Sequence, residues 1–514
     1  MVRTPTTLTA FAAVDLGATS GRVMLGLVRD AATVDLVETG RFPNGPVTAP
    51  DGESLHWDVL RLWEGVVDGL REAGRVAATH GVELSGVGVD SWAVDYGLVG
   101  DDEHLVRPAR CYRDPRFLDV ADGVYERVPA SEHYAVNGLQ HLPFTTEFQL
   151  VDEVTGGAGE AFAAARTLLL IPDLITFWLS GRRVAEVTNA STTGLLDARA
   201  RTWSSALLGR LAAEYPGLGR LPALLPELVE AGTVVGELGP WVRARTGLGP
   251  VPVVAVASHD TAAAVVGTPL PARQGDEVAA YVSSGTWSLV GLELDAPVLT
   301  EASRAAGFTN ELGLDGTVRY LHNVMGLWVL DECRREWART GDPVDLGELL
   351  AAAAAEPGGR TVVDLDDPAF LAPGDMPRRV AHAAARAGQP VPATRAQTAR
   401  AVLDSLAAAY ARTIHQAAAL AGVRVTQVHV VGGGSRNALL CRLTADATGL
   451  PVVAGPVEAA ALGNVLVQAR AVGVLVDDDV DDDGGPRGLG GLRDVVAASS
   501  DLVRIDPARI DPAR

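Results

Sequence analysis

The sequence predicts an α/β protein of two domains, on the evidence of its length and of a repeated order of elements. The chain has 514 residues and 47% hydrophobic content, which is more than one hydrophobic core usually serves. The order strand, strand, strand, helix, strand is expected near the N-terminus and again in the second half, so the pattern is internally duplicated although the sequence is not. A ligand cleft between two such domains would be a common arrangement.

The segment Asp15 to Arg22 (D-L-G-A-T-S-G-R) lies between two apolar runs and is predicted to be a glycine turn that joins two strands. No helix start signal follows it, whereas Rossmann and P-loop proteins pass from their glycine turn directly into a helix. Backbone N–H groups of such a turn, together with the Thr19 and Ser20 hydroxyls, can cradle a phosphate. An acidic residue beside the turn, with Asp15 as the candidate, can hold a magnesium ion on that phosphate.

The other elements follow from hydrophobic spacing. A long helix over Trp57–His80 is predicted because its apolar residues recur as on one helical face. Short apolar runs elsewhere predict strands. The predicted strands are Thr33–Phe42, Gly86–Val89, Val278–Ser283, Thr286–Leu294, Thr317–Leu321 and Gln427–Val431, and a second long helix is predicted over Thr398–Ala421.

Proline and glycine mark the expected domain boundary. The stretch Thr246–Pro252 (T-G-L-G-P-V-P) suits a hinge, so the predicted domains are residues 1–250 and 251–475, followed by an acidic, partly disordered tail at 476–514. Like charges repel in Asp477–Gly485 (D-D-D-V-D-D-D-G-G), which is therefore expected to be disordered or solvated. Residues 357–392 are predicted to be irregular, and the terminal repeat from Arg504 to Arg514 to be a loose tail.

Composition excludes several classes of function. The net charge of -21 repels nucleic-acid phosphates. The sequence contains no lysine, which excludes a Walker lysine and Schiff-base chemistry on a lysine side chain. The three cysteines are widely separated and imply neither a disulfide framework nor a zinc site. Without a signal peptide or a run of about 18 apolar residues, the chain is expected to be cytoplasmic and to bind neither nucleic acid nor membrane.

Three further segments place polar residues at the ends of apolar strands. In Val251–Val265 the strand stops at S-H-D-T; such a quartet points into a cleft, although it could instead only cap the next helix. In Tyr281–Leu289 a turn with hydroxyls joins two strands, as in a phosphate loop or in an ordinary hairpin. In Val428–Asn437 three glycines let a flat ring or a phosphate approach the backbone before a helix that starts near Asn437.

In this order, the four segments resemble the phosphate-1, phosphate-2 and adenosine motifs of the actin and hexokinase ATPase superfamily. Within it the chain is most similar to the FGGY carbohydrate kinases, and among those to the rhamnulokinase branch. The resemblance spans roughly Ala13 to Asn464 and rests on motifs such as G-V-D-S-W-A-V-D-Y, V-A-S-H-D-T, Y-V-S-S-G-T-W-S-L and V-G-G-G-S-R-N. It implies two actin-like (ribonuclease H-like) domains with an ATP and sugar cleft between them, the first carrying the sugar site and phosphate-1 loop and the second the catalytic base and adenosine site.

The resemblance also implies a role for individual residues. Asp260 matches the catalytic base. The positions matching ATP-binding residues are Ala18, Thr19, Ser20, Gly21, Arg22, Thr286, Asp331, Gly433 and Asn437, and those matching substrate-binding residues are Ala93, His259, Thr261 and Asn323. Two of them depart from the family pattern: Asp331 replaces an ATP-contacting glutamine, and Ala93 replaces a substrate-contacting glycine. The first adds an anion near the nucleotide, and the second adds a methyl group beside the sugar.

The implied activity is ATP- and Mg²⁺-dependent phosphorylation of a ketose, with the 1-hydroxyl of L-rhamnulose as the best single candidate. L-Fuculose and D-xylulose stay open, because discrimination of one methyl group is worth only about 1–3 kcal/mol. A non-catalytic actin-like ATP-binding module is the rival from another class, and the S-H-D-T quartet counts against it. A sugar-binding transcription regulator is disfavoured by the acidic charge. The sequence leaves the oligomeric state open.

Overall fold

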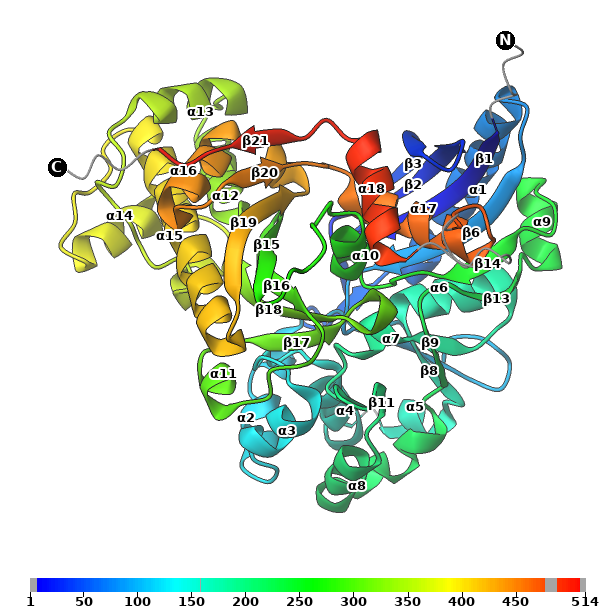
Figure 1. Cartoon of the computed structure of the whole chain (residues 1–514). Coiled ribbons are helices and arrows are strands. Elements are labelled where there is room, and N and C mark those ends of the chain that lie inside the picture. Colours follow the sequence, from blue (N-terminus) through cyan, green and yellow to red (C-terminus); the bar gives the residue numbers. More distant parts are fainter. Residues whose placement is uncertain (1–6, 158, 477–487, 509–514) are drawn as a thin grey trace, which may run out of the picture. The chain divides into compact units, whose positions relative to one another are not determined.

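The computed structural model describes residues 7–157, 159–476 and 488–508 (Figure 1). Contacts between residues divide the chain into two compact units. Unit 1 comprises Met1–Pro269, Leu294–Tyr320 and Ala459–Ser499, and unit 2 comprises Leu270–Glu293, Leu321–Glu458 and Ser500–Arg514. Each unit is therefore assembled from three separate stretches of chain. The acidic tract at 477–485 lies outside the described residues.

Unit 1 is built on a six-stranded mixed sheet. Its strand order is β3 (Thr33–Pro43), β2 (Ser20–Arg29), β1 (Leu8–Leu16), β6 (Leu84–Ser91), β14 (Pro252–Ala255) and β13 (Thr233–Glu237). The pairs β3/β2, β2/β1 and β14/β13 are antiparallel, whereas β1/β6 and β6/β14 are parallel. The predicted strand, glycine turn and strand at the N-terminus are confirmed.

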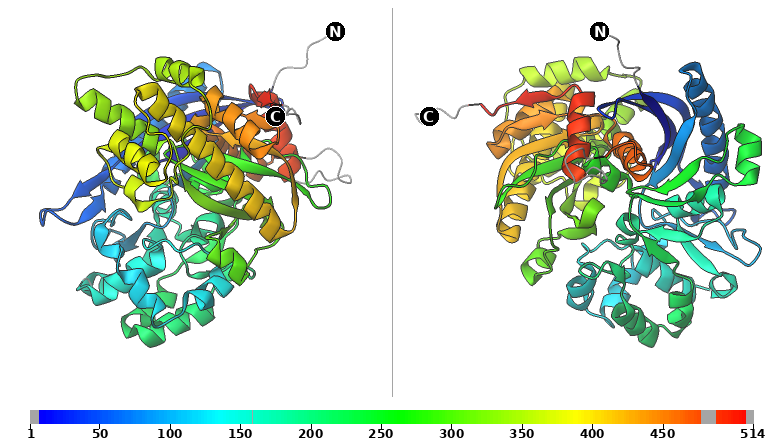
Figure 2. Two further views of the ribbon diagram at one scale, coloured as in Figure 1. Left: turned by 90° about the vertical axis from the view of Figure 1, so that its left-hand side faces the viewer. Right: turned by 45° about the vertical axis from the view of Figure 1, so that its right-hand side comes forward.

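Both faces of this sheet are buried, because alternate side chains of β1 belong to two different hydrophobic cores. Ala10, Ala12 and Val14 share a core with α1 (Val59–Thr79). Phe11 and Ala13 belong to a second core with α17 (Ala459–Ala471). Successive side chains of a strand point to opposite faces, so the sheet lies between the two helices, as the right-hand view of Figure 2 shows.

The rest of unit 1 consists of short elements, mostly inserted between β6 and β13. Many of them enclose a third core, which includes Phe148, Phe162 and Leu211. The helices are α2 (Val120–Tyr125), α3 (Ala130–Asn137), α4 (Thr146–Thr155), α5 (Gly159–Ala164), α6 (Ile171–Ser180), α7 (Val187–Ala190), α8 (Ser205–Glu214), α9 (Pro240–Thr246), α10 (Asp260–Val266), α11 (Glu301–Ala305) and α18 (Leu489–Ser499), with 3-10 turns η1 (Pro115–Phe117), η2 (Pro216–Ala223) and η3 (Leu314–Gly316). The strands are β4 (Pro46–Thr48), β5 (Leu55–Trp57), β7 (Tyr96–Val99), β8 (Thr167–Leu170), β9 (Val184–Glu186), β10 (Leu196–Asp197), β11 (Thr202–Trp203), β12 (Glu227–Val229) and β17 (Thr309–Leu312).

Unit 2 repeats the strand order of unit 1. Its strands belong to a seven-stranded sheet that runs β17, β18 (Val318–Met325), β16 (Trp287–Leu294), β15 (Glu277–Ser284), β19 (Arg424–Val431), β20 (Val452–Ala454) and β21 (Val503–Ile505), with β17 itself grouped in unit 1. As in unit 1, a hairpin pair β16/β15 is followed by the parallel pairs β15/β19 and β19/β20 and by an antiparallel edge strand. The chain passes from unit 1 to unit 2 within β18. The repeated order predicted from the sequence is thus present at the level of topology.

The longest helix of unit 2, α15 (Arg395–Ala421), packs against this sheet. A hydrogen bond of 2.6 Å between the Tyr410 hydroxyl of α15 and the Ser288 hydroxyl of β16 holds the helix there. The other elements are α12 (Trp328–Arg339), α13 (Leu346–Ala355), η4 (Pro368–Phe370), α14 (Met376–Arg386), η5 (Gly433–Arg436) and α16 (Ala438–Thr448).

The structure differs from the predictions at several boundaries. Trp57 belongs to β5 and not to the long helix, because Asp58 caps that helix. Residues 357–392, predicted to be irregular, contain α14. A division after residue 250 puts β14 and α10 into the second domain, whereas contacts in the structure group them with unit 1. The region predicted as a tail contains α18, whose Leu492, Val495 and Val496 lie in a core of unit 1, and β21, which pairs with β20.

Among the described residues, no helix is both long enough and apolar enough to cross a membrane.

Candidate active site

The parallel strands of unit 1 end together at one edge of its sheet. Asp15 and Asp90 are partners in the register of β1 and β6. Beyond them, Ser91 N donates to Ser258 O (2.9 Å), and Trp92 N donates to Leu16 O (3.1 Å). The carboxyl ends of parallel strands are the usual place for a ligand site in α/β sheets. Unit 1 therefore brings together the N-terminal glycine turn, the segment around Ala93 and the S-H-D-T quartet.

The glycine turn that contains Ala18, Thr19 and Ser20 is held tightly. Gly17 N donates to Ser20 O (3.0 Å), and Asn44 closes the turn from outside by donating its Nδ2 to Gly17 O (2.8 Å). Gly21 is buried against the Phe42 ring, which would lie 2.2 Å from any added Cβ. Thr19 is exposed at the tip. Sequence reasoning missed Asn44, whose only local signal was a proline- and glycine-rich stretch.

Two predicted site residues contact each other beside this turn. The Arg22 guanidinium forms an ion pair with the buried Asp15 carboxylate. The neighbouring Asp90 is fully buried, and burial raises its pKa well above the ordinary value, with the Asp15 charge adding to the effect. The Asn464 amide donates to Asp90 Oδ2 (2.6 Å) and acts in the opposite direction. The arrangement places negative charge, balanced by one arginine, at the end of β1.

Asp260 is the first residue of α10, and residues 256–259 connect it to the end of β14. Its side chain is 32% exposed. Burial raises the pKa of this carboxyl, the nearby His259 lowers it and the Asp15 charge raises it further. Thr261 N donates to Asp260 Oδ1 (2.6 Å), which fixes the carboxylate. A fixed, partly accessible carboxylate with a raised pKa has the properties of a general base.

The buried Glu186 carboxylate holds the first residue of the S-H-D-T quartet, Ser258, in place. Its Oε2 accepts hydrogen bonds from Ser258 N (2.9 Å) and Ser258 Oγ (2.8 Å), and its Oε1 accepts one from Thr188 N (2.9 Å). Asn189 Nδ2 donates to Ser258 O (3.3 Å). Sequence reasoning missed Glu186, because a single acidic residue after a short apolar run carries no motif of its own.

Ala93 lies in a strained turn. The next residue, Val94, has φ +66°, a conformation that a β-branched residue adopts only when its surroundings impose it. Asp95 N donates back to Ala93 O (2.9 Å). The buried Asp95 carboxylate accepts from Trp57 Nε1 (2.5 Å) and Trp92 Nε1 (3.0 Å), and burial raises its pKa to about 6. This network holds the turn, and so the predicted substrate-contacting position, in one conformation.

In unit 2, the turn that contains Thr286 packs against the start of α12 and against the V-G-G-G segment. Leu327 N donates to Gly285 O (2.9 Å), so α12 begins beside this turn. A Cβ on Gly326 would lie 2.5 Å from Thr286 O. On the other side, a Cβ on Gly434 would lie 2.0 Å from Ser284 Oγ. Gly326 and Gly434 are therefore required for these close approaches.

The remaining predicted nucleotide residues lie around this turn in unit 2. Gly433 is exposed, and Asn437 caps α16 by accepting a hydrogen bond from Leu440 N at its Oδ1 (3.0 Å). Asp331 lies in the first turn of α12, is 44% exposed and forms an ion pair with Arg334 (3.3 Å). Asn323, predicted to contact substrate, is half-buried in β18.

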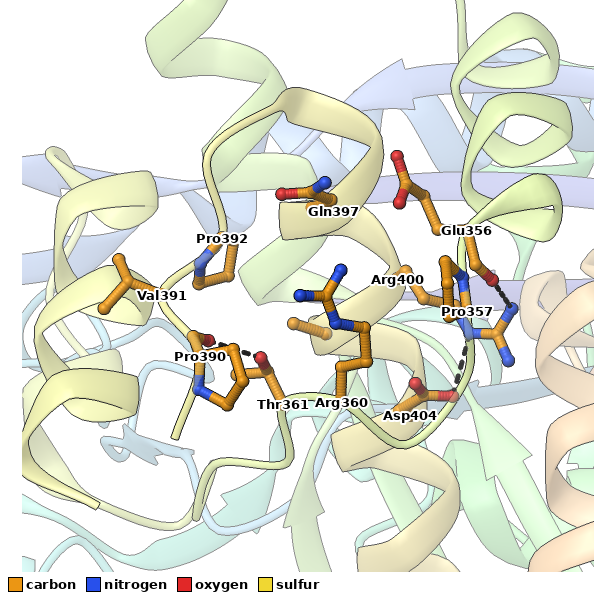
Figure 3. Close-up of a pocket in the computed structure, with 11 residues that line it drawn as sticks. Glu356, Pro357, Arg360, Thr361, Pro390, Val391, Pro392, Gln397, Arg400 and Asp404 are labelled. Atoms are coloured by element: carbon orange, nitrogen blue, oxygen red, sulfur yellow. Dashed lines mark hydrogen bonds and ion pairs between the residues drawn. The ribbon is translucent and has the colours of Figure 1, made fainter. Parts of the chain in front are cut away.

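A separate small cavity in unit 2 has no part in this site. It lies between α15 and the segments around Thr361 and Val391 (Figure 3). The Arg400 guanidinium beside it is bound to Asp404 Oδ1 (3.0 Å) and Glu356 O (2.9 Å). Its volume is about 30 Å³, room for about one water molecule. None of the predicted site residues lines it.

Two family descriptions match the chain. Residues 10–267 match the N-terminal domain, and residues 280–472 the C-terminal domain, of the FGGY family of carbohydrate kinases. The "Rhamnulokinase" of Bacteroides thetaiotaomicron is 38% identical over 497 residues, which cover 97% of this chain and 96% of that protein. The "Rhamnulokinase" of Pectobacterium carotovorum is 40% identical over 466 residues, 90% of this chain and 88% of that protein.

A solved structure has the same fold. The crystal structure of xylulose kinase from Rhodospirillum rubrum superimposes with a TM-score of 0.74 and covers 97% of this chain and 94% of that one. At 20% sequence identity this likeness concerns the fold alone.

Proposed function

This chain belongs to the FGGY family of carbohydrate kinases, and we propose that it transfers the γ-phosphoryl group of ATP to the 1-hydroxyl of L-rhamnulose. The family's two actin-like α/β domains are the fold of this chain. The observation that carries the choice of sugar is the 38% identity to a rhamnulokinase along 97% of the chain. The ATP and sugar cleft between the domains is part of the proposal.

Asp260 is the proposed general base. Its carboxylate accepts the proton of the sugar hydroxyl while that oxygen forms a bond to the γ-phosphorus, and the bond from phosphorus to the β–γ bridging oxygen breaks, so that ADP leaves. Such a base typically contributes roughly 10²–10⁴-fold to the rate. The raised pKa of Asp260 makes it a stronger proton acceptor than an ordinary aspartate. Its hydrogen bond from Thr261 N (2.6 Å) supports the role, because it fixes the direction of the carboxylate.

Phosphate charge has to be neutralised without lysine. We assign this task to the backbone N–H groups of the β1/β2 turn with the Thr19 and Ser20 hydroxyls, and in unit 2 to Thr286. Arg22 adds a positive charge, which it shares with Asp15. Positioning and charge stabilisation of this kind account for most of the catalysis of phosphoryl transfer.

Mg²⁺ fits this chain as an ion carried by ATP. Among the described residues, no group of three acidic, histidine or cysteine side chains could hold a metal alone. Mg²⁺ usually binds substrate phosphates plus one or two carboxylates and keeps several waters, and we assign the contact with that water shell to Asp15. When bound, the ion would neutralise charge on the transferred phosphoryl group.

The adenosine and sugar sites are assigned by position. We assign the adenosine to Gly433 and Asn437 in unit 2. In unit 1 the sugar would meet Ala93, held by the strained turn, and the side chains of His259 and Thr261. Asn323 in β18 is a further proposed contact. The rigid networks behind Ala93 and His259 support this assignment, because a sugar site discriminates hydroxyls only when its polar groups are fixed.

A ketose panel tests the substrate. Purified protein with ATP and Mg²⁺ is given L-rhamnulose, L-fuculose or D-xylulose, and ADP release is followed by a coupled assay. We expect the highest kcat/KM with L-rhamnulose and phosphate on its 1-hydroxyl. A clear preference for D-xylulose or L-fuculose would contradict the choice of sugar. ATP binding without turnover of any ketose would instead favour a non-catalytic actin-like module.

A further inference from the structure

Two buried residues, Glu311 on β17 and Arg319 on β18, contact the Nδ1 side of the His259 ring. We propose that Arg319, held by Glu311, is a positioning residue that keeps the His259 ring in the tautomer with its proton on Nε2, the nitrogen nearer Asp260. The chemical consequence rests on the proposed function, because it concerns Asp260 as the base. The tautomer itself does not depend on that function.

The Arg319 guanidinium is fixed on several sides. It is fully buried, and its Nη1 lies 2.9 Å from Glu311 Oε2. Its Nε donates to Leu312 O (3.3 Å), and its Nη1 also reaches Thr261 Oγ1 (3.3 Å). The remaining nitrogen, Nη2, lies 3.1 Å from His259 Nδ1. A guanidinium held by four partners in the interior cannot turn away from the ring.

This contact determines which ring nitrogen carries the proton. Guanidinium N–H groups are donors only, so His259 Nδ1 has to be the acceptor of the 3.1 Å hydrogen bond. The proton of a neutral ring then lies on Nε2, which is 2.8 Å from Thr261 Oγ1 and 3.4 Å from Asp260 Oδ1. The competing tautomer would donate Nδ1–H to Glu311 Oε2 at 3.1 Å, but that N–H would also point at the Arg319 donors.

The tautomer affects the charge of Asp260. The Nε2–H is hydrogen-bonded to Thr261 Oγ1 (2.8 Å) and lies 3.4 Å from Asp260 Oδ1. A proton this close to a carboxylate favours its ionised form, which opposes the effects of burial and of Asp15 on β1. Asp90 on β6 also faces Asp260, and Arg319 adds a favourable positive charge. In the other tautomer an unprotonated Nε2 would lie at this distance, and the carboxylate would lose that stabilisation of its charge. Arg319 therefore keeps the base in its active form at lower pH.

Histidine ¹⁵N NMR tests the tautomer without any need for turnover. The full-length protein is labelled at histidine, long-range ¹H–¹⁵N spectra are recorded at neutral pH, and the His259 signals are identified by their loss in His259→Gln. We expect protonated Nε2 and unprotonated Nδ1 in the native protein. In Arg319→Met, where Glu311 becomes the only partner of Nδ1, we expect the proton to move to Nδ1.

The matched control is Glu153→Gln. It removes a different fully buried carboxylate of unit 1, one that pairs with Arg107 and Arg110, and it should leave the His259 signals unchanged. A native ring protonated on Nδ1 or on both nitrogens would overturn the proposal. So would identical His259 signals in the native protein and Arg319→Met.

The pH dependence of kcat/KM tests the effect on the base. In Arg319→Met the acid limb should move to higher pH by roughly 1 unit. In Glu311→Gln the acid limb should move to lower pH. The Arg319 charge then has no carboxylate partner and favours the ionised form of Asp260, while His259 Nδ1 still accepts the hydrogen bond from Arg319. Arg319→Lys, which retains a charged donor, should restore part of the native profile.

Opposite shifts in the two partner variants separate positioning from damage to the fold. A purely structural effect lowers kcat at every pH and leaves the acid limb in place, as expected for Glu153→Gln. Shifts of the acid limb in the same direction in both variants would overturn the proposal. The absence of a shift in Glu311→Gln would also overturn it, and this can be measured even if Arg319→Met does not fold. If Asp260→Asn retained full turnover, the proposed base would be wrong, while the NMR result on the tautomer would still stand.

Discussion

At the scale of single residues, the site in unit 1 depends on how buried charges are held. Asp15 is paired with Arg22, Asp260 lies beside His259, and Asp90 relies on the Asn464 amide. Asp15 and Asp90 lie near the ends of β1 and β6, and Asp260 is the first residue of α10. The backbone of these elements fixes the orientations of the three carboxylates, and burial within the fold raises the pKa of Asp90 and of Asp260.

The raised pKa of Asp260 predicts the acid limb of the reaction. The base is active when ionised, so kcat/KM should fall as pH drops through a pKa above the ordinary value of 3.8. The measurement is kcat/KM for the ketose against pH at saturating ATP, with circular dichroism at each pH as the control for folding. An acid limb at or below pH 3.8, with the protein still folded, would contradict the environment described for Asp260.

Asp331 should weaken ATP binding. It is a half-exposed carboxylate in the first turn of α12, beside the Thr286 turn. Asp331→Gln removes an anion from the neighbourhood of the nucleotide phosphates, so KM for ATP should fall about two- to fivefold. Glu348→Gln is the matched control, since it removes an exposed carboxylate from the first turn of α13 in the same unit. Equal ATP affinities in Asp331→Gln and the native protein would place Asp331 outside the site.

Residues with a motif could be predicted from the sequence, and their supporting residues could not. Asp260 and Thr286 stand out because each interrupts an apolar strand with polar residues. Arg319 lies 60 positions from His259, within an apolar stretch (T-V-R-Y-L), and only the pairing of strands brings the two together. Asn44 and Glu186 could not be predicted for the same reason, since Asn44 binds Gly17 and Glu186 binds Ser258, which are distant in sequence.

At the scale of elements, helix α10, which begins with the proposed base, is positioned by its close crossing with α17. A Cβ on Gly463 would lie 1.9 Å from Ala263 O, and a Cβ on Gly267 would lie 2.0 Å from Ala459 O. The two backbones thus meet through a pair of glycines. This contact sets the distance between α10, whose first residue is Asp260, and the helix that covers one face of the sheet.

Gly463→Ala should destabilise the protein by at least about 2 kcal/mol, because the contact is with backbone that cannot move aside. Thermal or urea unfolding measures the effect. Gly490→Ala is the matched control, since that glycine is exposed in α18 with open space around it, and it should be stabilising by about 0.5–1 kcal/mol. Equal stability of Gly463→Ala and the native protein would show that the helices do not cross this closely.

The elements with the strongest periodicity were predictable, and the irregular ones were not. The hairpins at both glycine turns and the helices α1 and α15 follow from apolar spacing that is long enough to distinguish a strand from a helix. The four residues of β17 (T-N-E-L) carry no apolar run, and they form a strand because the fold buries them. In the same way, α14 begins with M-P-R-R, a sequence more typical of a surface loop.

At the scale of the whole molecule, the two units share one strand order but recruit distant parts of the chain. Unit 1 takes α17 and α18 from beyond residue 458. Proline and glycine residues mark local breaks in regular structure, so they cannot indicate that residues 459–499 belong to the same unit as the N-terminal residues. This is why the segment Thr246–Pro252 looks like a hinge although β14 follows it directly within the sheet of unit 1.

A fragment of residues 1–250 should therefore not fold on its own. It lacks β14, which pairs with β6, and it lacks α17, which covers Phe11 and Ala13. We expect an aggregated or largely unfolded product by circular dichroism and by the dispersion of its NMR spectrum. A monomeric fragment with cooperative unfolding would contradict this assembly and would support a boundary at residue 250.

The central claim is that Asp260 is the base of a kinase that acts on L-rhamnulose, and comparison of the native protein with Asp260→Asn tests it most directly. The measurement is ADP release in the presence of L-rhamnulose, ATP and Mg²⁺, with ATP binding determined separately and Asp494→Asn, an exposed position on α18, as the control. We expect Asp260→Asn to lose roughly 10²-fold or more of kcat while it binds ATP normally, and Asp494→Asn to be fully active. Undiminished turnover in Asp260→Asn would contradict this claim.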